Sequence, residues 1–394
     1  MADHAEQIVI GRHYRSGEAI QVVCRDGVIA EVKAAGPVGE LAELPIIGPG
    51  FVDLQVNGMA GYDFNGAEAQ ASSAEQITRA LWEEGVTAYC PTVITNAPEL
   101  IEHSLRLIGS AAGQAGPLGA SMVGIHLEGP FISGEPGAKG AHPAEYVQAP
   151  DWERFAQWND MSGGRIRIVT LAPEWEGSVD FIHACRDAGI AVSLGHTAAG
   201  AESLEAAAAA GASMVTHFGN GIAPLLPRHP NALWTQLADD RLACCVIADG
   251  HHIPDALLQV VYRVKGDKMI LVSDAVQLCG MAPGAYRMPV GGDVVLTEAG
   301  RLHLRDDERL LAGAAAPLLH GLNHIVQRGI AELGEAWDMA SIHPARELNL
   351  PQAQALSPGA PADLVLLASL GGRYRVQETI KSGISVYRQA EWGS

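Results

Sequence analysis

The sequence has few cysteines and few basic residues, and each shortage excludes a class of protein. Only 6 of its 394 residues are cysteine, with no C-x-x-C pair, so we expect neither a disulfide framework nor a cysteine-based zinc site. Lys and Arg total 26 against 45 Asp and Glu, which gives a formal charge of −19. A chain this acidic repels phosphate backbones and anionic membrane surfaces, and it contains no basic stripe to overcome that repulsion. We therefore expect no nucleic-acid partner and no membrane partner.

Long apolar runs are absent as well. None approaches the ~18 residues of a membrane helix, and the first residues lack the basic segment and apolar stretch of a secretory signal. The cysteines are expected to be reduced, mostly buried thiols, and a cytoplasmic location is predicted. With 48% hydrophobic and 18% charged residues, the composition is that of a globular protein with a large core.

Short β-branched runs alternate with longer segments of helical period, which is typical of βα units around a parallel sheet. A doubly wound sheet is the alternative, but it seldom needs eight parallel strands, and no G-x-G-x-x-G follows the first run. We therefore predict an α/β fold with a TIM-type (β/α)8 barrel over residues 50–349. The eight predicted strands are 51–56, 87–94, 122–127, 165–171, 190–194, 213–216, 243–247 and 269–272.

Both chain ends have a different texture, with short alternating strands separated by turn residues. Asp26-Gly27 predicts a tight hairpin turn, and Gly48-Pro49-Gly50 ends the first segment. A similar pattern resumes in residues 362–367 and 374–387. We predict that residues 1–49 and 350–394 form one small β-sandwich domain. A further hairpin, residues 293–304, is predicted to be inserted after the eighth barrel strand.

Polar side chains follow the predicted barrel strands, where the active site of a TIM barrel lies. The third, fifth and sixth strands lead into Glu128, His196 and His217. This is the His₂Glu ligand set of a catalytic zinc site, which leaves one position for water. A single histidine at a strand end is more often an ordinary hydrogen-bonded side chain, but three strand ends that all supply ligands favour a metal. We predict one divalent metal per subunit, zinc first, with iron or cobalt as alternatives.

Asp274 follows the eighth strand and is expected beside that metal. A carboxylate there can accept a proton from attacking water and pass it to the leaving group; considered alone, Asp274 could instead be a helix N-cap. Gln55 and Asn57, at the first strand, argue against a second metal because carboxamides are weak ligands for zinc-like ions. These residues predict single-metal hydrolytic chemistry.

Together these motifs resemble the N-acetylglucosamine-6-phosphate deacetylases of the amidohydrolase superfamily. The resemblance runs over nearly the whole chain. Its most specific part is the string His126-Leu127-Glu128-Gly129-Pro130-Phe131, which lies in register with the other motifs. Those are Pro49-Gly50-Phe51-Val52-Asp53, Lys139-Gly140-Ala141-His142-Pro143, Gly195-His196-Thr197, Thr216-His217, Ala248-Asp249-Gly250 and Ser273-Asp274-Ala275.

The resemblance implies a role for each candidate residue. The metal would be held by Glu128, His196 and His217. Asp274 would be the general base and then the general acid, and His142 would contact the substrate and polarise its carbonyl oxygen. The sugar phosphate would be bound by Asn220, Gly221, Arg228 and His252. Arg228 would act in its own site or in that of a neighbouring subunit, and a shared site would require a homodimer or higher oligomer.

The implied activity is hydrolysis of N-acetylglucosamine 6-phosphate to glucosamine 6-phosphate and acetate. One alternative keeps the chemistry but changes the substrate to another N-acyl amino sugar, an N-acyl amino acid or a cyclic amide. A second alternative is a barrel that binds sugar phosphate without catalysis. The chain departs from the usual family pattern at Gly221, where the family often has alanine, and at the doubled His251-His252.

Overall fold

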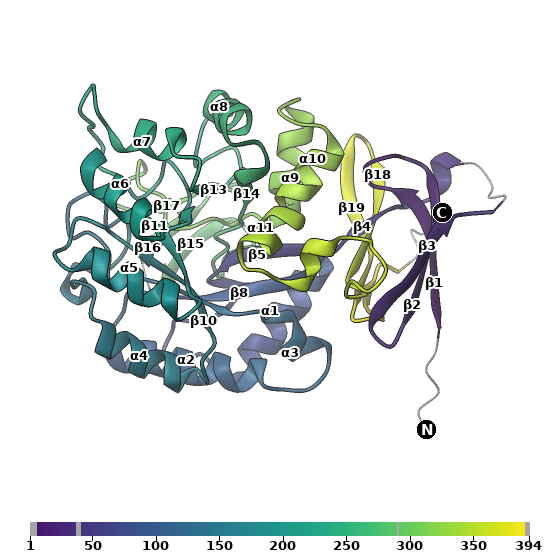
Figure 1. Ribbon diagram of the computed structural model, residues 1–394, viewed down its shortest axis with the longest axis horizontal. Coiled ribbons are helices and arrows are strands. Elements are labelled where there is room, and N and C mark those ends of the chain that lie inside the picture. Colours follow the sequence, from purple (N-terminus) through teal and green to yellow (C-terminus); the bar gives the residue numbers. More distant parts are fainter. Residues whose placement is uncertain (1–5, 37–40, 290, 391–394) are drawn as a thin grey trace.

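The computed structural model describes residues 6–36, 41–289 and 291–390. Its largest sheet contains eight parallel strands arranged in sequence order (Figure 1). The end of the first strand meets the segment that follows the last one, where Val56 and Ala275 form a parallel bridge, so the sheet closes almost completely into a barrel. This confirms the predicted α/β barrel, with strand ends that differ from the prediction by at most three residues. The strands are β5 (Phe51–Val56), β8 (Val86–Ile94), β9 (Ile125–Glu128), β10 (Ile166–Leu171), β11 (Ala191–Leu194), β12 (Met214–Val215), β13 (Ala243–Val246) and β14 (Met269–Leu271).

Helices cover the outside of the barrel (Figure 1). In the first of them, Ala74, Ile77 and Leu81 are buried, so that one stripe of apolar side chains at helical spacing packs inward. The longer helices are α1 (Ala71–Glu83), α2 (Pro98–Ala112), α4 (Trp152–Met161), α5 (Ser178–Asp187), α6 (Ala201–Ala210), α8 (Asp255–Lys265) and α9 (Leu318–Gln327). The shorter ones are α3 (Pro117–Ser121), α7 (Ala232–Ala238), α10 (Leu333–Met339) and α11 (Ile342–Glu347).

Strands from both chain ends share one seven-stranded sheet, in the order β20-β19-β18-β4-β1-β2-β3. The predicted turn at Asp26-Gly27 is present, with φ of 53° and 77°. The sandwich arrangement and the domain boundaries stay predictions, and their residues 1–5, 37–40 and 391–394 lie outside the described part. The strands are β1 (Gln7–His13), β2 (Ala19–Arg25), β3 (Val28–Ala34), β4 (Ile46–Pro49), β18 (Leu364–Leu370), β19 (Arg373–Lys381) and β20 (Ile384–Arg388).

Trp337 joins this terminal sheet to the barrel. Its side chain is fully buried, and its Nε1–H donates to the carbonyl oxygen of Pro49 at 2.9 Å. The indole packs on Tyr14 and Phe51, with ring centroids 5.2 and 5.3 Å away. A Cβ on Gly48 would lie 2.4 Å from the indole, so glycine is required at this close approach. The barrel and the terminal sheet therefore share a continuous core.

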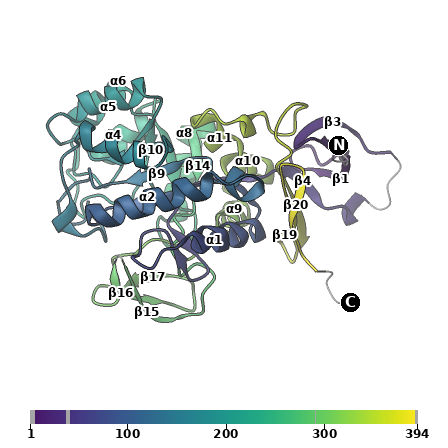
Figure 2. The same cartoon turned by 90° about the horizontal axis from the view of Figure 1, so that it is seen from below.

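A three-stranded antiparallel sheet, the insertion sheet, lies between β14 and α9 in the chain and apart from the terminal sheet in space (Figure 2). Its strands are β15 (Gly284–Met288), β16 (Gly292–Leu296) and β17 (Leu302–Leu304). The predicted hairpin is thus confirmed as β16 and β17. The additional strand β15 was missed because its sequence, GAYRM, is largely solvent-facing and carries no clear apolar alternation. A short hairpin, β6 (Gly58–Met59) and β7 (Tyr62–Asp63), follows β5.

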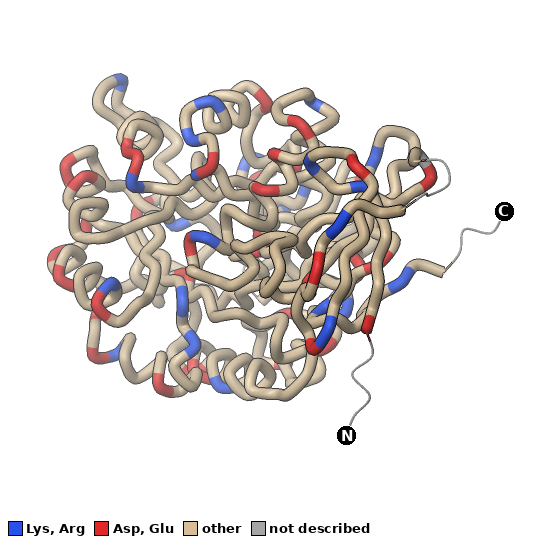
Figure 3. The backbone as a smooth tube through the Cα atoms, turned by 45° about the vertical axis from the view of Figure 1, so that its right-hand side comes forward, with Lys and Arg blue, Asp and Glu red and all other residues tan. Residues whose placement is uncertain are grey.

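Charged residues lie mostly on the outer helices and loops, where basic and acidic positions are interspersed (Figure 3). All six cysteines are buried and free, as the sequence predicted. Among the described residues, no helix combines the length and apolar character needed to span a bilayer.

Candidate active site

A cavity of about 490 Å³ opens at the carboxyl ends of the barrel strands. A volume of this order suits a small-molecule ligand. Most of the candidate residues line it, as expected for side chains at the end of a TIM barrel that carries active sites. Those in the lining are Asn57, Glu128, His142, His196, His217, Asn220, Gly221, His252 and Asp274. Gln55 lies buried against this group, and Arg228 does not line the cavity of its own chain.

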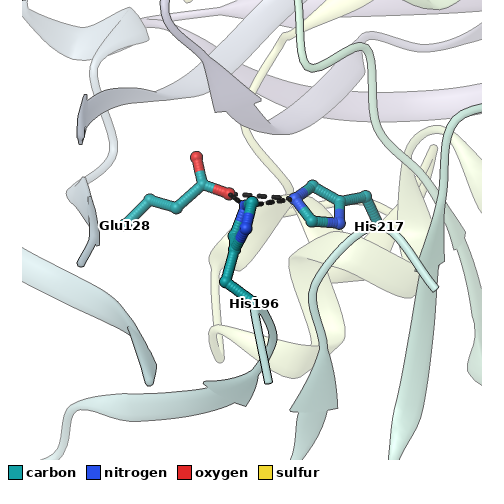
Figure 4. Close-up of side chains that lie close together, drawn as sticks. All are labelled: Glu128, His196 and His217. Atoms are coloured by element: carbon teal, nitrogen blue, oxygen red, sulfur yellow. Dashed lines mark hydrogen bonds and ion pairs between the residues drawn. The ribbon is translucent and has the colours of Figure 1, made fainter. Parts of the chain in front are cut away.

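Glu128, His196 and His217 converge on one point (Figure 4). Glu128 Oε1 lies 3.1 Å from His217 Nε2 and 3.3 Å from His196 Nε2, and the two Nε2 atoms are 3.0 Å apart. All three side chains are buried. Because the three ligand atoms of these buried side chains face each other, the group suits a cation that would accept all three lone pairs.

The backbone directs these side chains into the barrel mouth. His196, His217 and Asp274 follow β11, β12 and β14, and all three are left-handed, with φ of 49°, 27° and 48°. Residues other than glycine rarely adopt this conformation, and such strain concentrates at functional sites. At three strand ends the chain therefore accepts backbone strain to aim a polar side chain at the same point.

The hydrogen bonds around the three ligands fit a metal. His196 Nδ1 lies 2.9 Å from the carbonyl oxygen of Ala138; because a carbonyl only accepts, Nδ1 carries the proton and Nε2 of the neutral ring presents its lone pair. Burial would raise the pKa of Glu128, but its contacts with His196 and His217 lower it well below the usual range. The set is thus a carboxylate and two imidazoles, a donor set suited to zinc, iron or cobalt.

Asp274 lies next to this group and is held by two carboxamides. Gln55 Nε2 donates to Asp274 Oδ1 at 3.0 Å and to Glu128 Oε1 at 2.9 Å, while Asn57 Nδ2 donates to Asp274 Oδ1 at 2.8 Å. Burial, followed by the charge of Glu128, raises the pKa of Asp274 to about 8. A dication at Glu128 would lower that pKa again.

Gln55 and Asn57 thus act as hydrogen-bond donors to carboxylates. In the described part of the chain, Glu128, His196 and His217 are the one group of three or more histidine, cysteine or carboxylate side chains placed to hold a metal. The geometry supports a single ion.

His142 approaches the metal group from the loop after β9. Its ring centroid is 4.4 Å from that of His196, in an edge-on arrangement, and its buried Nδ1 has no hydrogen-bond partner in the described structure. Burial lowers the pKa of His142 to about 3, so the ring is neutral. Lys139 Nζ holds this loop by donating to the carbonyl oxygens of Gly140 and His142, at 3.2 and 3.1 Å.

Gly221 lies directly against His196. A Cβ at this position would be 2.9 Å from His196 Nδ1, and its φ is +59°, so both space and backbone conformation favour glycine. The neighbouring Asn220 also lines the cavity. In this chain the glycine therefore brings the loop after β12 close to a candidate metal ligand.

His252 is fixed by Asp249. Its Nδ1 lies 2.8 Å from Asp249 Oδ2, and the backbone N–H groups of His251 and His252 donate to Asp249 Oδ1. Burial alone would raise the pKa of Asp249, but its hydrogen bond with His252 lowers it to about 2. His252 therefore lines the cavity with its Nδ1 already occupied.

Three features of the site were not predicted. Arg301 and Arg309, from the region of β17, line the cavity, although neither follows a barrel strand. Inside the barrel, His126 Nε2 lies 2.7 Å from Thr170 Oγ1, which continues to Thr216 Oγ1 at 2.7 Å. The signal for this buried polar layer was available, because His126, Thr170 and Thr216 interrupt otherwise apolar barrel strands near their carboxyl ends.

Comparisons with known proteins agree with this geometry. The family model described as "Amidohydrolase family" matches residues 46–386. An N-acetylglucosamine-6-phosphate deacetylase of Mus musculus is 36% identical over 358 residues, which cover 88% of this chain and 85% of that protein. An N-acetylgalactosamine-6-phosphate deacetylase of Escherichia coli is 31% identical over 89% of this chain and 90% of that protein.

A solved structure gives the same result for the fold. It is a variant of the N-acetyl-D-glucosamine-6-phosphate deacetylase of Mycobacterium smegmatis in complex with N-acetyl-D-glucosamine 6-phosphate. It matches with a TM-score of 0.86 and 26% identity, over 97% of this chain and 99% of that chain. The resemblance predicted from the motifs is confirmed, and the chain belongs to the amidohydrolase family of hydrolytic enzymes.

Proposed function

We propose that this enzyme removes the acetyl group from an N-acetylated amino sugar 6-phosphate, with N-acetylglucosamine 6-phosphate as the main substrate. The observation that carries the proposal is the buried group of Glu128, His196 and His217 beside Asp274, inside a cavity of about 490 Å³. Relatives that align over most of the chain are named as deacetylases of amino sugar phosphates. The products would be the free amino sugar phosphate and acetate.

Asp274 would carry the proton. As a carboxylate it would take a proton from the water that attacks the amide carbonyl, and it would then deliver that proton to the departing nitrogen. The side-chain N–H groups of Gln55 and Asn57 donate to Asp274 Oδ1 at 3.0 and 2.8 Å. These hydrogen bonds fix the orientation of the carboxylate that would transfer the proton. A carboxylate held in this way needs little movement between accepting the proton from water and donating it to the nitrogen.

His142 would stabilise the charge that develops on the carbonyl oxygen. A neutral imidazole can donate one N–H to that oxygen without giving up the proton, and the pKa of about 3 keeps His142 neutral. A divalent metal held by Glu128, His196 and His217 would add Lewis-acid polarisation and would acidify water. We propose zinc, since the two imidazoles and one carboxylate match its catalytic sites.

The phosphate would be bound by Asn220, Gly221 and His252, which line one cavity. Arg228 is exposed on the loop before α7 and does not line the cavity of its own chain. We propose that Arg228 completes the phosphate site of a neighbouring subunit, so the active form is a homodimer or a larger homo-oligomer. A cytoplasmic location remains a prediction.

The test is an acetate-release assay on the purified enzyme, with its metal content measured in parallel. N-acetylglucosamine 6-phosphate should be hydrolysed, and the unphosphorylated sugar should be a much poorer substrate. Equal turnover of unphosphorylated N-acetyl sugars or of N-acyl amino acids would overturn the assignment.

N-acetylgalactosamine 6-phosphate is the second candidate substrate. It is favoured by the 31% identity to the Escherichia coli N-acetylgalactosamine-6-phosphate deacetylase. The two sugars differ only in the configuration at one ring carbon, so the same metal group could act on either. A comparison of kcat/KM for the two phosphates in the same assay decides between them.

A further inference from the structure

Two guanidinium groups line the active-site cavity. Among the described residues, no carboxylate forms an ion pair with the guanidinium of Arg301. The cavity wall contains the carboxylates of Asp63, Glu128 and Asp274 and the guanidinium groups of Arg301 and Arg309. Arg309 is paired with Asp307 through two contacts, at 2.9 and 2.8 Å. Arg301 instead donates from Nη2 to a backbone carbonyl oxygen, that of Glu308, at 2.5 Å.

The insertion sheet holds Arg301 at a defined place. Arg301 ends the turn between β16 and β17, and this turn is closed on both sides. The Thr297 N–H donates to the Arg301 carbonyl oxygen at 3.0 Å, and the Arg301 N–H donates to Thr297 Oγ1 at 3.0 Å. The guanidinium therefore projects from an ordered hairpin.

His251 connects this hairpin to the loop that carries His252. His251 Nε2 lies 3.0 Å from the carbonyl oxygen of Ala299, and because a carbonyl only accepts, Nε2 is the donor. Asp249 Oδ1 accepts the backbone N–H of both histidines, at 2.8 and 3.0 Å. The turn before Arg301 and the loop of His252 are thus tied together at the cavity that both residues line.

The charge of the cavity favours a further cation beside an anionic substrate. A phosphate dianion entering a chain of net charge −19 would be repelled by the cavity carboxylates, and a cation close to the phosphate reduces that repulsion. A guanidinium suits this task because it offers several N–H groups in a planar fork that matches phosphate oxygens. Within the described part of the chain, the side chain of Arg301 bonds to Glu308 through Nη2 alone, which leaves its remaining N–H groups for a ligand.

We propose that Arg301 binds the substrate phosphate from within the same chain and determines the preference for phosphorylated over unphosphorylated amino sugars. This proposal rests on the proposed function. It assigns to the insertion sheet, held against the barrel by His251, a binding role separate from the metal group and Asp274.

The test compares Arg301→Ala with Arg305→Ala. Arg305 lies next to the same sheet, pairs with Asp293 at 3.3 Å and is not in the cavity wall. For N-acetylglucosamine 6-phosphate, Arg301→Ala should raise KM by about 10- to 100-fold, as expected for a lost charge-assisted hydrogen bond. For unphosphorylated N-acetylglucosamine, kcat/KM should stay within about twofold. Arg305→Ala should change neither.

The outcomes separate this inference from the proposed function. If the wild-type enzyme releases no acetate from any amino sugar phosphate, the proposed function is wrong. If the wild type prefers the phosphate and Arg301→Ala keeps that preference, the inference alone is wrong. Loss of turnover on both sugars alike would also overturn it, because Arg301 would then support the fold rather than the phosphate. Arg301→Lys, which keeps the charge, should retain more of the preference than Arg301→Ala.

Discussion

Gln55 and Asp274 are joined by a hydrogen bond of 3.0 Å between the first barrel strand and the residues that follow the last one. One residue further along each segment, the backbones meet at the bridge between Val56 and Ala275. Closure of the barrel and placement of the candidate general base are therefore the same event. A change that loosens the seam between β5 and β14 should also misplace Asp274.

Replacing Asp274 by asparagine tests its role in proton transfer. The amide oxygen of the variant can still accept from Gln55 and Asn57, but an amide cannot take a proton from water. We expect acetate release to fall at least 10²- to 10⁴-fold, while metal content and substrate binding are retained. Asp180→Asn, an exposed change on α5, serves as the control. Undiminished turnover by Asp274→Asn would remove this residue from the mechanism.

Removing the metal should abolish activity and reduce thermal stability. A bound ion stabilises the folded state by mass action, and here it would also relieve the close approach of the two Nε2 atoms at 3.0 Å. Dialysis against a chelator should therefore lower both turnover and Tm, and added zinc should restore both. Glu128→Gln should show reduced metal content by elemental analysis. Full activity in a metal-free preparation would contradict the assignment.

Arg228 can be placed in its own or a neighbouring site by mixing two inactive variants. If Arg228 acts across a subunit interface, a dimer of one Arg228→Ala chain and one Asp274→Asn chain has one complete site. Random assortment would then restore about one quarter of the wild-type sites. Co-expression of the two chains followed by the acetate assay measures this recovery. Activity no higher than that of the separate variants would place Arg228 in its own subunit or outside the site.

Trp337 should contribute strongly to stability because it joins the terminal sheet to the barrel. Trp337→Ala leaves a cavity and removes the bond to Pro49, so we expect a loss of about 3–5 kcal/mol in the free energy of unfolding. Urea denaturation measures the effect. Val264→Ala, at a position 51% exposed on α8, should change stability by less than about 0.5 kcal/mol. Similar values for both variants would show that the junction is not a stability determinant.

The buried carboxyl group of Asp53 should make the free energy of unfolding depend on pH. Burial raises its pKa from 3.8 to about 6, although its Oδ1 accepts from the N–H groups of Gln55 and Ser273. Between about pH 4 and pH 6 the folded state therefore keeps a proton on Asp53 that the unfolded state has released. The contribution of Asp53 to stability falls as the pH rises through this range, and it is constant above about pH 6. The contribution is on the order of 3 kcal/mol.

Unfolding curves of the wild type and of Asp53→Asn isolate this contribution, since all other titrating groups are shared. The difference in unfolding free energy between the two proteins should move in favour of the variant between about pH 4 and 6. Measurements on metal-free protein avoid competition between protons and the metal. A difference that is constant over this range would refute the assignment.

The barrel was predictable because its strands are buried runs of β-branched residues, and the metal group because each ligand follows such a run. Glu128, His196 and His217 needed only strand order to be brought together. The site roles of these residues and the domain boundaries stay predictions. Strand order did not reveal contacts that are made by insertions between the barrel elements. Arg301 reaches the cavity through a hairpin whose position depends on His251, and Arg228 is exposed within one chain.

The left-handed φ values of His196, His217 and Asp274 were also beyond the sequence patterns, because such conformations are expected of glycine. At Gly221, by contrast, the residue at a left-handed position is a glycine. Its importance appeared in the sequence only as a departure from the family that the chain resembles. The reason is a histidine ring that would lie 2.9 Å from an added Cβ, and no sequence pattern records that distance.

The terminal sheet has a consequence for how the chain is made. Strand β4 lies between β1, which is made before it, and β18, which is made after residue 363. During synthesis one edge of β4 therefore stays unpaired until the whole barrel has been synthesised, because its partner β18 is made only afterwards. Unpaired edges of this kind invite association with other chains. The last strands to be synthesised thus cover the exposed edge of the first strands. A chain that ends before β18 should therefore be an early target for chaperones and proteases.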